Sequence, residues 1–191
     1  MKRQIRRSVF ETNSSSTHAI CISKGDYNII NHIDFDVDDF GWECETYRTL
    51  YNKASYLITA ILGLDKETSD NYLNKLTDIL DNNGIEYTLP ELKVGSYEYD
   101  EKTVYYYDID GYIDHASKTK EFLDAVLLDS DTLFRYLFGD SMIVTGNDND
   151  DGFRDRMYVA EGEKVSKWGT YTIYGDLKPE FDDYEISFHV N

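Results

Sequence analysis

The sequence predicts an α+β protein that forms one domain, with a mixed or antiparallel sheet and a central helical group. Segments that alternate between apolar and polar residues, as strands do, occur near both ends of the chain and between the helices. Apolar residues at helical spacing are confined to the middle. The length fits a single domain over residues 1–191, and 41% hydrophobic residues are enough for a real core.

The first half of the chain contains one predicted strand and two predicted helices. Residues 18–22 alternate and predict the strand. Residues 34–45 carry six carboxylate side chains among aromatic anchors, which indicates an acidic loop or edge segment. Apolar residues then recur at helical spacing over residues 45–63 and again over residues 67–82, and each stretch ends in residues that stop helices.

The second half alternates between strands and helices. Residues 85–89 and 103–109 predict strands, separated by glycine, serine and acidic residues. A helix is expected to begin at Ser117, as its N-cap, and to continue over residues 122–138 with a break at 129–131. The remaining predicted strands are residues 142–145, 170–174 and 184–190.

The charge of the chain restricts its partners. Lysine and arginine number 19 against 37 aspartate and glutamate, so the formal net charge is −18. A protein that binds free DNA or RNA needs clustered cations on one face, and this composition argues against such binding. The same charge favours docking onto the basic surface of a nucleic-acid-binding host protein.

Cysteine, histidine and hydropathy exclude other classes. Two cysteines do not make a disulfide framework, and with four histidines they lack the spacing of a structural zinc site. No apolar run reaches the length of a signal peptide core or of a membrane span. We therefore expect a cytoplasmic protein without a membrane partner.

Three polar blocks are candidates for a functional site, and the first is residues 1–18. Arginine can neutralise a phosphate, histidine and glutamate can transfer protons, and asparagine and serine can orient a substrate. The candidate catalytic residues of this block are Arg6, Arg7, Glu11 and His18. Its candidate substrate-binding residues are Asn13, Ser14, Ser15 and Ser16. The structural alternative is a solvated basic arm followed by a loop or cap sequence.

The second block is Gly-Tyr-Ile-Asp-His at residues 111–115, between a predicted strand and a predicted helix. Asp114 or another carboxylate can orient His115, whose ordinary pKa lies close enough to neutrality for general acid–base catalysis. His115 is therefore a candidate catalytic residue, and Ser117 a candidate substrate-binding residue. The structural alternative is a histidine that precedes a helix and bonds to the backbone.

The third block, residues 145–152, is rich in side-chain oxygens. Asn147 is a candidate substrate-binding residue, and Asp148 and Asp150 are candidate ligands for a divalent cation, the one cofactor that the sequence suggests. The block is not an EF-hand, because no glutamate follows at the required distance. The alternatives are an Asx-rich turn or an acidic contact with a basic partner.

Residues 3–18 read R-x-x-R-R-S-V-F-E-T-N-S-S-S-T-H, and the blocks at 111–115 and 145–149 add Gly-Tyr-Ile-Asp-His and Thr-Gly-Asn-Asp-Asn. On these motifs the chain resembles a largely uncharacterised family of phage and mobile-element proteins of Firmicutes. The likeness is specific over residues 3–20 and thin outside the three motifs. It implies an accessory phage gene, and genes of this kind often antagonise host defence, as anti-CRISPR proteins do.

Three hypotheses of function follow. In the first, the three blocks form one pocket of a ribonuclease or phosphodiesterase that cleaves guide RNA held on a Cas9-like ribonucleoprotein. In the second, the chain is a non-enzymatic acidic inhibitor that mimics nucleic acid and occludes a basic groove. In the third, it is an enzyme that acts on a nucleotide as a small molecule. The sequence slightly favours the catalytic, nucleic-acid-directed mechanism.

Overall fold

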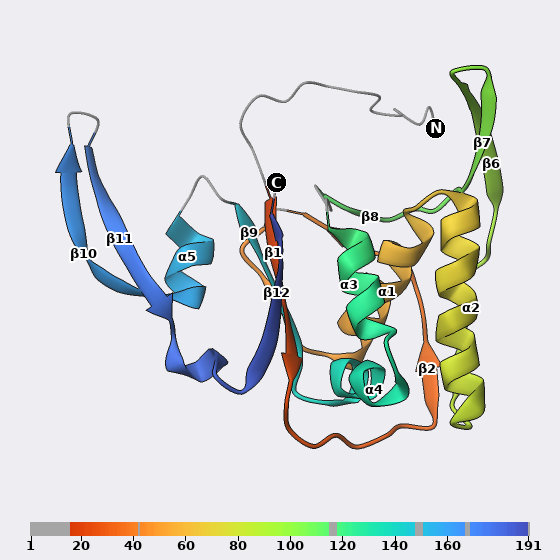
Figure 1. Cartoon of the computed structure of the whole chain (residues 1–191), viewed down its shortest axis with the longest axis horizontal. Helices are drawn as coiled ribbons and strands as arrows, with labels where there is room; N and C mark the ends of the chain where they lie inside the picture. Colours follow the sequence, from red (N-terminus) through yellow and green to blue (C-terminus); the bar gives the residue numbers. More distant parts are fainter. Residues whose placement is uncertain (1–15, 42, 115–117, 148–150, 167–168, 191) are drawn as a thin grey trace.

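The computed structural model describes residues 16–41, 43–114, 118–147, 151–166 and 169–190, which form a mixed α+β fold as the sequence predicts (Figure 1). The helices are α1 (Leu50–Leu62), α2 (Lys66–Asn82), α3 (Thr119–Val126), α4 (Ser130–Phe138), α5 (Asp151–Met157) and the 3-10 turn η1 (Pro179–Phe181). The strands are β1 (Ser16–Ser23), β2 (His32–Asp34), β3 (Asp39–Phe40), β4 (Thr46–Tyr47), β5 (Glu86–Thr88), β6 (Val94–Tyr99), β7 (Lys102–Tyr107), β8 (Tyr112–Ile113), β9 (Met142–Asn147), β10 (Tyr158–Ser166), β11 (Gly169–Leu177) and β12 (Tyr184–Val190). None of the described helices is long and apolar enough to span a bilayer.

The central sheet has four strands in the order β12-β1-β9-β4, and all of its neighbours are antiparallel. It therefore joins the two ends of the described chain, with β1 paired directly to β12. Every residue of β1 is buried. Since side chains of a strand alternate between faces, both faces of this sheet must be covered.

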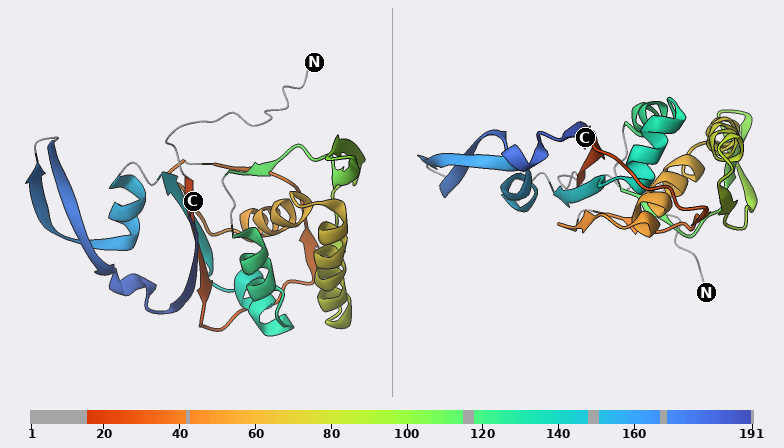
Figure 2. Two further views of the ribbon diagram at one scale, coloured as in Figure 1. Left: turned by 45° about the horizontal axis from the view of Figure 1, so that its top comes forward. Right: turned by 90° about the horizontal axis from the view of Figure 1, so that it is seen from below.

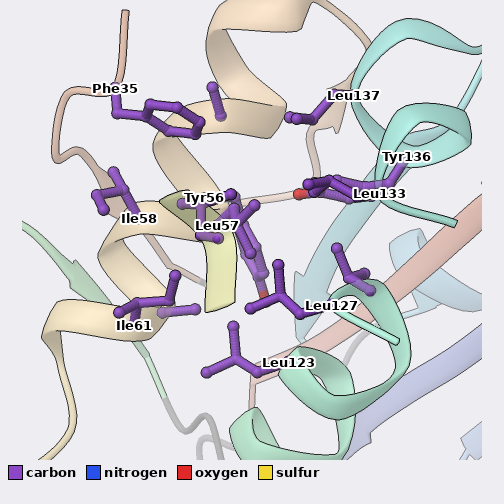
Figure 3. Close-up of a cluster of buried hydrophobic side chains, with 14 of the residues drawn as sticks. Phe35, Tyr56, Leu57, Ile58, Ile61, Leu123, Leu127, Leu133, Tyr136 and Leu137 are labelled. Atoms are coloured by element: carbon purple, nitrogen blue, oxygen red, sulfur yellow. The ribbon is translucent and has the colours of Figure 1, made fainter. Parts of the chain in front are cut away.

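Helices α1 to α4 lie on one face of the central sheet (Figures 1 and 2). Every residue of α1 from Lys53 to Leu62 is buried, which identifies it as the innermost helix. Thr49 caps α1 by accepting a hydrogen bond from the Asn52 amide. Side chains from α1, α3 and α4 converge in the core, where Tyr56 lies among leucines and isoleucines (Figure 3).

The other face of the sheet contacts α5 and the segment around η1. Its buried cluster is small and consists of Ala19, Cys21, Met142, Val144, Phe153, Met157 and Phe181. Among the described strands, β10 and β11 pair only with each other, and they project away from this side as a long hairpin (Figures 1 and 2). We call α5 and the β10–β11 hairpin the arm.

Several predicted boundaries are confirmed and two are wrong. Asp129 caps α4, so the helical stretch does break at 129–131 as predicted. The helix expected from residue 45 begins only at Leu50, because Thr46 and Tyr47 pair with β9. The N-cap of α3 is Lys118, one residue after the predicted Ser117, and it makes no side-chain capping bond.

The sequence analysis missed the short strands β2, β4 and β8 and the turn η1, and it also missed three longer elements, β6, α5 and β10. Strand β6 contains Gly95 and Ser96, which read as turn residues, but it pairs with β7 along its whole length. Strand β10 carries charged residues and Gly162, so it lacks the alternation of a half-buried strand. Helix α5 begins at Asp151, where the sequence suggested an oxygen-rich loop running on to residue 152.

Candidate functional site

The described ends of the three polar blocks meet at one end of the central sheet. Ser16 of β1 is the register partner of Asn147 of β9. The Ser16 Oγ donates a hydrogen bond of 2.9 Å to the main-chain carbonyl of Asp114, 98 positions away in the sequence. This end is the top of the sheet in Figure 1. We call Ser16, His18, Gly41, Asp114 and Asn147 the sheet-end site.

His18 lies below this end, on the side of the sheet that α1 covers. Only 1% of its surface is exposed. Its Nδ1 is 3.0 Å from the Tyr56 hydroxyl oxygen, and its Nε2 is 2.9 Å from the Gly41 carbonyl oxygen. Both ring nitrogens therefore face protein groups rather than an open pocket.

The partners of His18 determine where its proton lies. A carbonyl only accepts, so Nε2 carries a hydrogen and donates to Gly41. In the neutral ring Nδ1 then accepts from the Tyr56 hydroxyl. Complete burial raises the pKa of Tyr56, which keeps this hydroxyl protonated. The histidine thereby ties the main chain at Gly41 to helix α1.

The segment after Gly41 is hydrogen-bonded to β9 through Thr145, another residue of the third block. The Thr145 amide donates to the Glu45 carbonyl at 3.0 Å, and its hydroxyl donates to the Glu43 carbonyl. Thr145 is fully buried. Its part in the described structure is to hold the loop that runs along the sheet-end site.

The second block reaches the site through the short parallel pair β3–β8. The Tyr112 amide donates to the Asp38 carbonyl at 3.2 Å, and the Asp114 amide donates to the Phe40 carbonyl at 2.8 Å. Gly111 allows this approach, because a Cβ there would lie 2.9 Å from the main-chain nitrogen and oxygen of Asp38. Backbone packing thus explains the glycine of Gly-Tyr-Ile-Asp-His.

A similar reason explains the glycine of Thr-Gly-Asn-Asp-Asn. A Cβ on Gly146 would lie 2.6 Å from the Cβ of Phe153 in α5. Phe153 belongs to the small cluster on the arm side of the sheet. Gly146 therefore lets α5 pack closely against the end of β9.

Exposed carboxylates surround the sheet-end site. The pairing of β3 with β8 brings the acidic segment around residues 36–39 next to Asp110, and the loop after Gly41 adds two glutamates. We define the acidic rim as Asp36, Asp39, Glu43, Glu45 and Asp110, all of which are exposed. A polyanion that approaches this rim from solution meets like charge.

A guanidinium that the sequence analysis did not single out contacts the same loop. Arg156 of α5 donates from Nη1 to the Thr46 hydroxyl at 3.4 Å. Arg156 lies four residues after the third block, in a segment for which no helix or strand is predicted. Its sequence context therefore does not indicate a contact with this loop. Tyr56 was likewise missed, although a tyrosine beside the apolar positions Leu57 and Ile58 of a predicted helix signals a buried hydroxyl that needs a partner.

Most of the predicted site residues lie outside the described residues. These are Arg6, Arg7, Glu11, Asn13, Ser14, Ser15, His115, Ser117, Asp148 and Asp150. The structure therefore places Ser16, His18 and Asn147 alone among the candidates. Within the described ranges no group of three or more His, Cys, Asp or Glu side chains could hold a metal ion.

Comparison of the chain with protein-family models, with curated proteins and with solved structures found no match.

Proposed function

We propose that the chain is a phage-type accessory protein that antagonises host defence in the host cytoplasm by cleaving a phosphodiester of RNA held by a basic host protein. The observation that carries this proposal is the meeting of the polar blocks, in which Ser16 bonds to Asp114 and pairs with Asn147. Polar motifs far apart in the sequence but adjacent in space are typical of a catalytic site. The resemblance of these same motifs to a phage family supports the biological setting.

The residues divide into those that position and those that react. His18 is a positioning residue, because both of its ring nitrogens are already hydrogen-bonded within the protein. Proton transfer then falls to His115 and Glu11, and phosphate neutralisation to Arg6 and Arg7. These four lie outside the described residues, so their roles rest on residue chemistry.

The acidic rim is the reason for proposing RNA on a protein rather than free RNA. With a net charge of −18, the chain repels a free polyanion. A basic ribonucleoprotein such as a Cas9–guide complex supplies attraction through its protein surface. In this arrangement, electrostatic contacts with the host protein provide the binding affinity, and the reaction takes place on the RNA that this protein holds.

The test mixes the purified protein with a loaded Cas9–guide complex and resolves the RNA on a denaturing gel, with and without magnesium. We expect shortened guide with the wild type and intact guide with His115→Ala. The matched control is His32→Ala, an exposed histidine 3.0 Å from Asp34 that should leave cleavage unchanged. Intact guide with the wild type would refute the proposed reaction on this complex.

The role of His18 has its own test in a glutamine variant. The glutamine side chain offers an amide N–H donor and a carbonyl acceptor, as the neutral His18 ring offers a donor to Gly41 and an acceptor to Tyr56. We expect His18→Gln to keep much of the activity with an unchanged pH–rate profile, whereas His18→Ala loses it. If both variants are inactive while folded, His18 is a proton-transfer group and not a positioning residue.

A second candidate function is favoured by the acidic rim itself. Because β3 and β8 bring two acidic segments together, the chain has a surface on which carboxylates can mimic phosphates. In that case the guide stays intact while DNA cleavage is lost, and added salt restores cleavage. Intact guide together with normal DNA cleavage would remove Cas9 as the target and favour the enzyme that acts on a nucleotide.

A further inference from the structure

The β6–β7 hairpin carries a row of aromatic side chains that is separate from the sheet-end site. In its register Tyr97 pairs with Val104, and Gly95 pairs with Tyr106, so these positions share one face. Tyr99 follows on the same face near the turn. We call Tyr97, Tyr99, Val104 and Tyr106 the tyrosine face. Tyr97 is 41% exposed and Tyr99 is 71% exposed.

The opposite face of the hairpin holds it to the body. Tyr107 is buried there, and its hydroxyl donates to a carboxylate oxygen of Asp70 in α2. The Lys66 ammonium lies 5.3 Å from the centroid of the Tyr107 ring. Since neighbouring residues in a strand point to opposite faces, the tyrosine face is the side of the hairpin opposite to Tyr107. The hairpin stands beside the upper end of α2 in Figure 1.

The tyrosine face is ordered by its own packing. A Cβ on Gly95 would lie 2.5 Å from the Tyr106 ring, so the ring lies across the space that the glycine leaves open. Tyr97 packs against Tyr106 with 5.9 Å between ring centroids. Rings that are fixed before binding lose little conformational entropy on binding, which is a property of interface tyrosines.

Acidic side chains flank the tyrosine face. The turn contributes Asp100 and Glu101. Lys102, the register partner of Tyr99, is a cation on the tyrosine face, and Glu98, the partner of Thr103, lies on the opposite face. Both turn residues have positive φ, 49° for Asp100 and 60° for Glu101, where a two-residue hairpin favours asparagine and glycine. The hairpin tip therefore presents two carboxylates where residues without charge fit the backbone better.

This combination selects a cationic partner. Nucleic-acid platforms pair aromatic rings with a positive groove, whereas here the turn beside the rings carries two carboxylates against one lysine. Arginine and lysine can stack on tyrosine rings while they pair with carboxylates. Two tyrosines of this chain already contact ammonium groups in that way, Tyr107 with Lys66 and Tyr72 with Lys75.

We propose that the tyrosine face is the docking surface for a basic polypeptide surface of the host target. The proposal rests on the proposed function in one respect, the expectation that the target is a basic protein. It places the contact that gives affinity on the hairpin, away from the sheet-end site. A second copy of this chain does not fit, because each copy brings the same acidic flank to the contact.

The probe is a synthetic peptide rich in arginine and lysine, titrated into isotope-labelled full-length protein at roughly 0.15 M salt. Amide shifts on NMR spectra report where it binds. We expect saturable shifts concentrated in residues 94–107. Shifts concentrated on the acidic rim, or spread over all acidic surfaces, would overturn the proposal. Shifts in the hairpin that depend on protein concentration without peptide would also overturn it, in favour of self-association.

Two variants and one control separate the aromatic from the electrostatic contribution. Tyr97→Ser with Tyr99→Ser should weaken peptide binding about tenfold or more, as expected for central aromatic contacts. Asp100→Asn with Glu101→Gly should weaken it about fivefold while the turn is kept. The control, Glu180→Gln with Asp183→Asn, removes the same two charges from an exposed segment around η1 and should change binding less than twofold by the same reasoning. Equal effects of the two charge variants would overturn the proposal.

The guide-cleavage gel is read separately on the same variants. Hairpin-dependent binding of the peptide with an intact guide leaves the docking surface standing and refutes the proposed reaction. Guide cleavage by the wild type without peptide binding at the hairpin supports the proposed reaction and refutes the docking surface. The two proposals therefore fail on different measurements.

Discussion

On one face of the central sheet lie α1 to α4 and a large apolar core, and on the other lies the arm over a cluster of seven residues. The helical face also holds buried polar groups that fix loops: His18 holds Gly41, and the Lys53 ammonium donates to the Gly139 carbonyl at 2.7 Å. The described arm side leaves large apolar side chains such as Val165 and Tyr171 exposed. Stability and the geometry of the sheet-end site are thus linked on the helical face, whereas the arm reaches the site through Arg156 and through the packing of Phe153 on Gly146.

The largest expected effect comes from truncating one fully buried apolar side chain on each face. Leu57 of α1 and Met157 of α5 are both fully buried. Leu57→Ala should lower the free energy of unfolding by about 3–5 kcal/mol, because the surrounding helices hold the cavity open. Met157→Ala should lower it by about 2 kcal/mol, because the thinly covered arm can relax into the space. Urea unfolding measures both, and equal losses would refute the difference between the faces.

The next effect is a pH dependence that belongs to the helical face. Burial lowers the pKa of Lys53 from 10.5 to about 8, with the nearby Arg48 lowering it further and Asp140 opposing. Between these two values the unfolded chain binds more protons than the folded protein, so stability rises with pH. We expect Lys53 to contribute a gain of about 2 kcal/mol between pH 8 and 10. The buried tyrosines Tyr56 and Tyr136, whose pKa values are raised, oppose this gain as the pH approaches 10.

Substitution of the lysine isolates that contribution. Lys53→Met should lose the rise in stability, whatever its effect on stability at neutral pH. Lys164→Met, an exposed lysine of the arm, should keep the wild-type rise. Chemical unfolding at a series of pH values gives both slopes, and a rise that survives in Lys53→Met would assign it to another group.

The same contrast explains what could be predicted from the sequence. Helices α1 and α2 were found because their apolar spacing is a local signal, and both end close to the expected residues. The burial of His18 was also signalled, since it alternates with Ile20 and Ile22 on one side of β1. This alternation with apolar residues favours a buried, structural role for His18 over the catalytic role that its chemistry suggests.

Contacts between residues far apart in the sequence have no comparable local signal. The contact of Ser16 with Asp114 depends on β3 and β8, each two residues long, which no local pattern predicts. The carbonyl of Gly41 is a partner that any residue type could provide. The meeting of the blocks had been a hypothesis, and only the fold could place their described ends together.

A smaller effect tests the buried hydrogen bond of the site. Tyr56→Phe removes the hydroxyl and leaves Nδ1 of His18 without that donor, which should cost about 1–2 kcal/mol of unfolding free energy. The matched change on the arm is Tyr174→Phe, whose hydroxyl contacts Asp155 at 2.5 Å in an exposed position. It should cost no more than about 0.5 kcal/mol. Thermal or urea unfolding compares them, and a larger loss for Tyr174→Phe would reverse the ranking of the two faces.

The smallest effect is a gain, and it sharpens the comparison within the helical face. Among the described residues, the Ser55 hydroxyl of α1 is the buried side-chain group that lacks a hydrogen-bond partner. Ser55→Ala removes that desolvated hydroxyl and improves helix propensity, so the free energy of unfolding should rise by up to about 1 kcal/mol.

Ser69 of α2 is the matched control, because it is equally buried but donates to the Ile61 carbonyl at 2.7 Å. Ser69→Ala removes this hydrogen bond, while the Ile61 carbonyl still accepts from the Leu64 amide, and it should cost about 1 kcal/mol. Opposite signs for one substitution at two buried helix positions would show that pairing decides the value of a polar group on this face. If both variants lose stability, Ser55 has a partner after all, and the polar groups of the helical face are more fully paired than the contacts indicate.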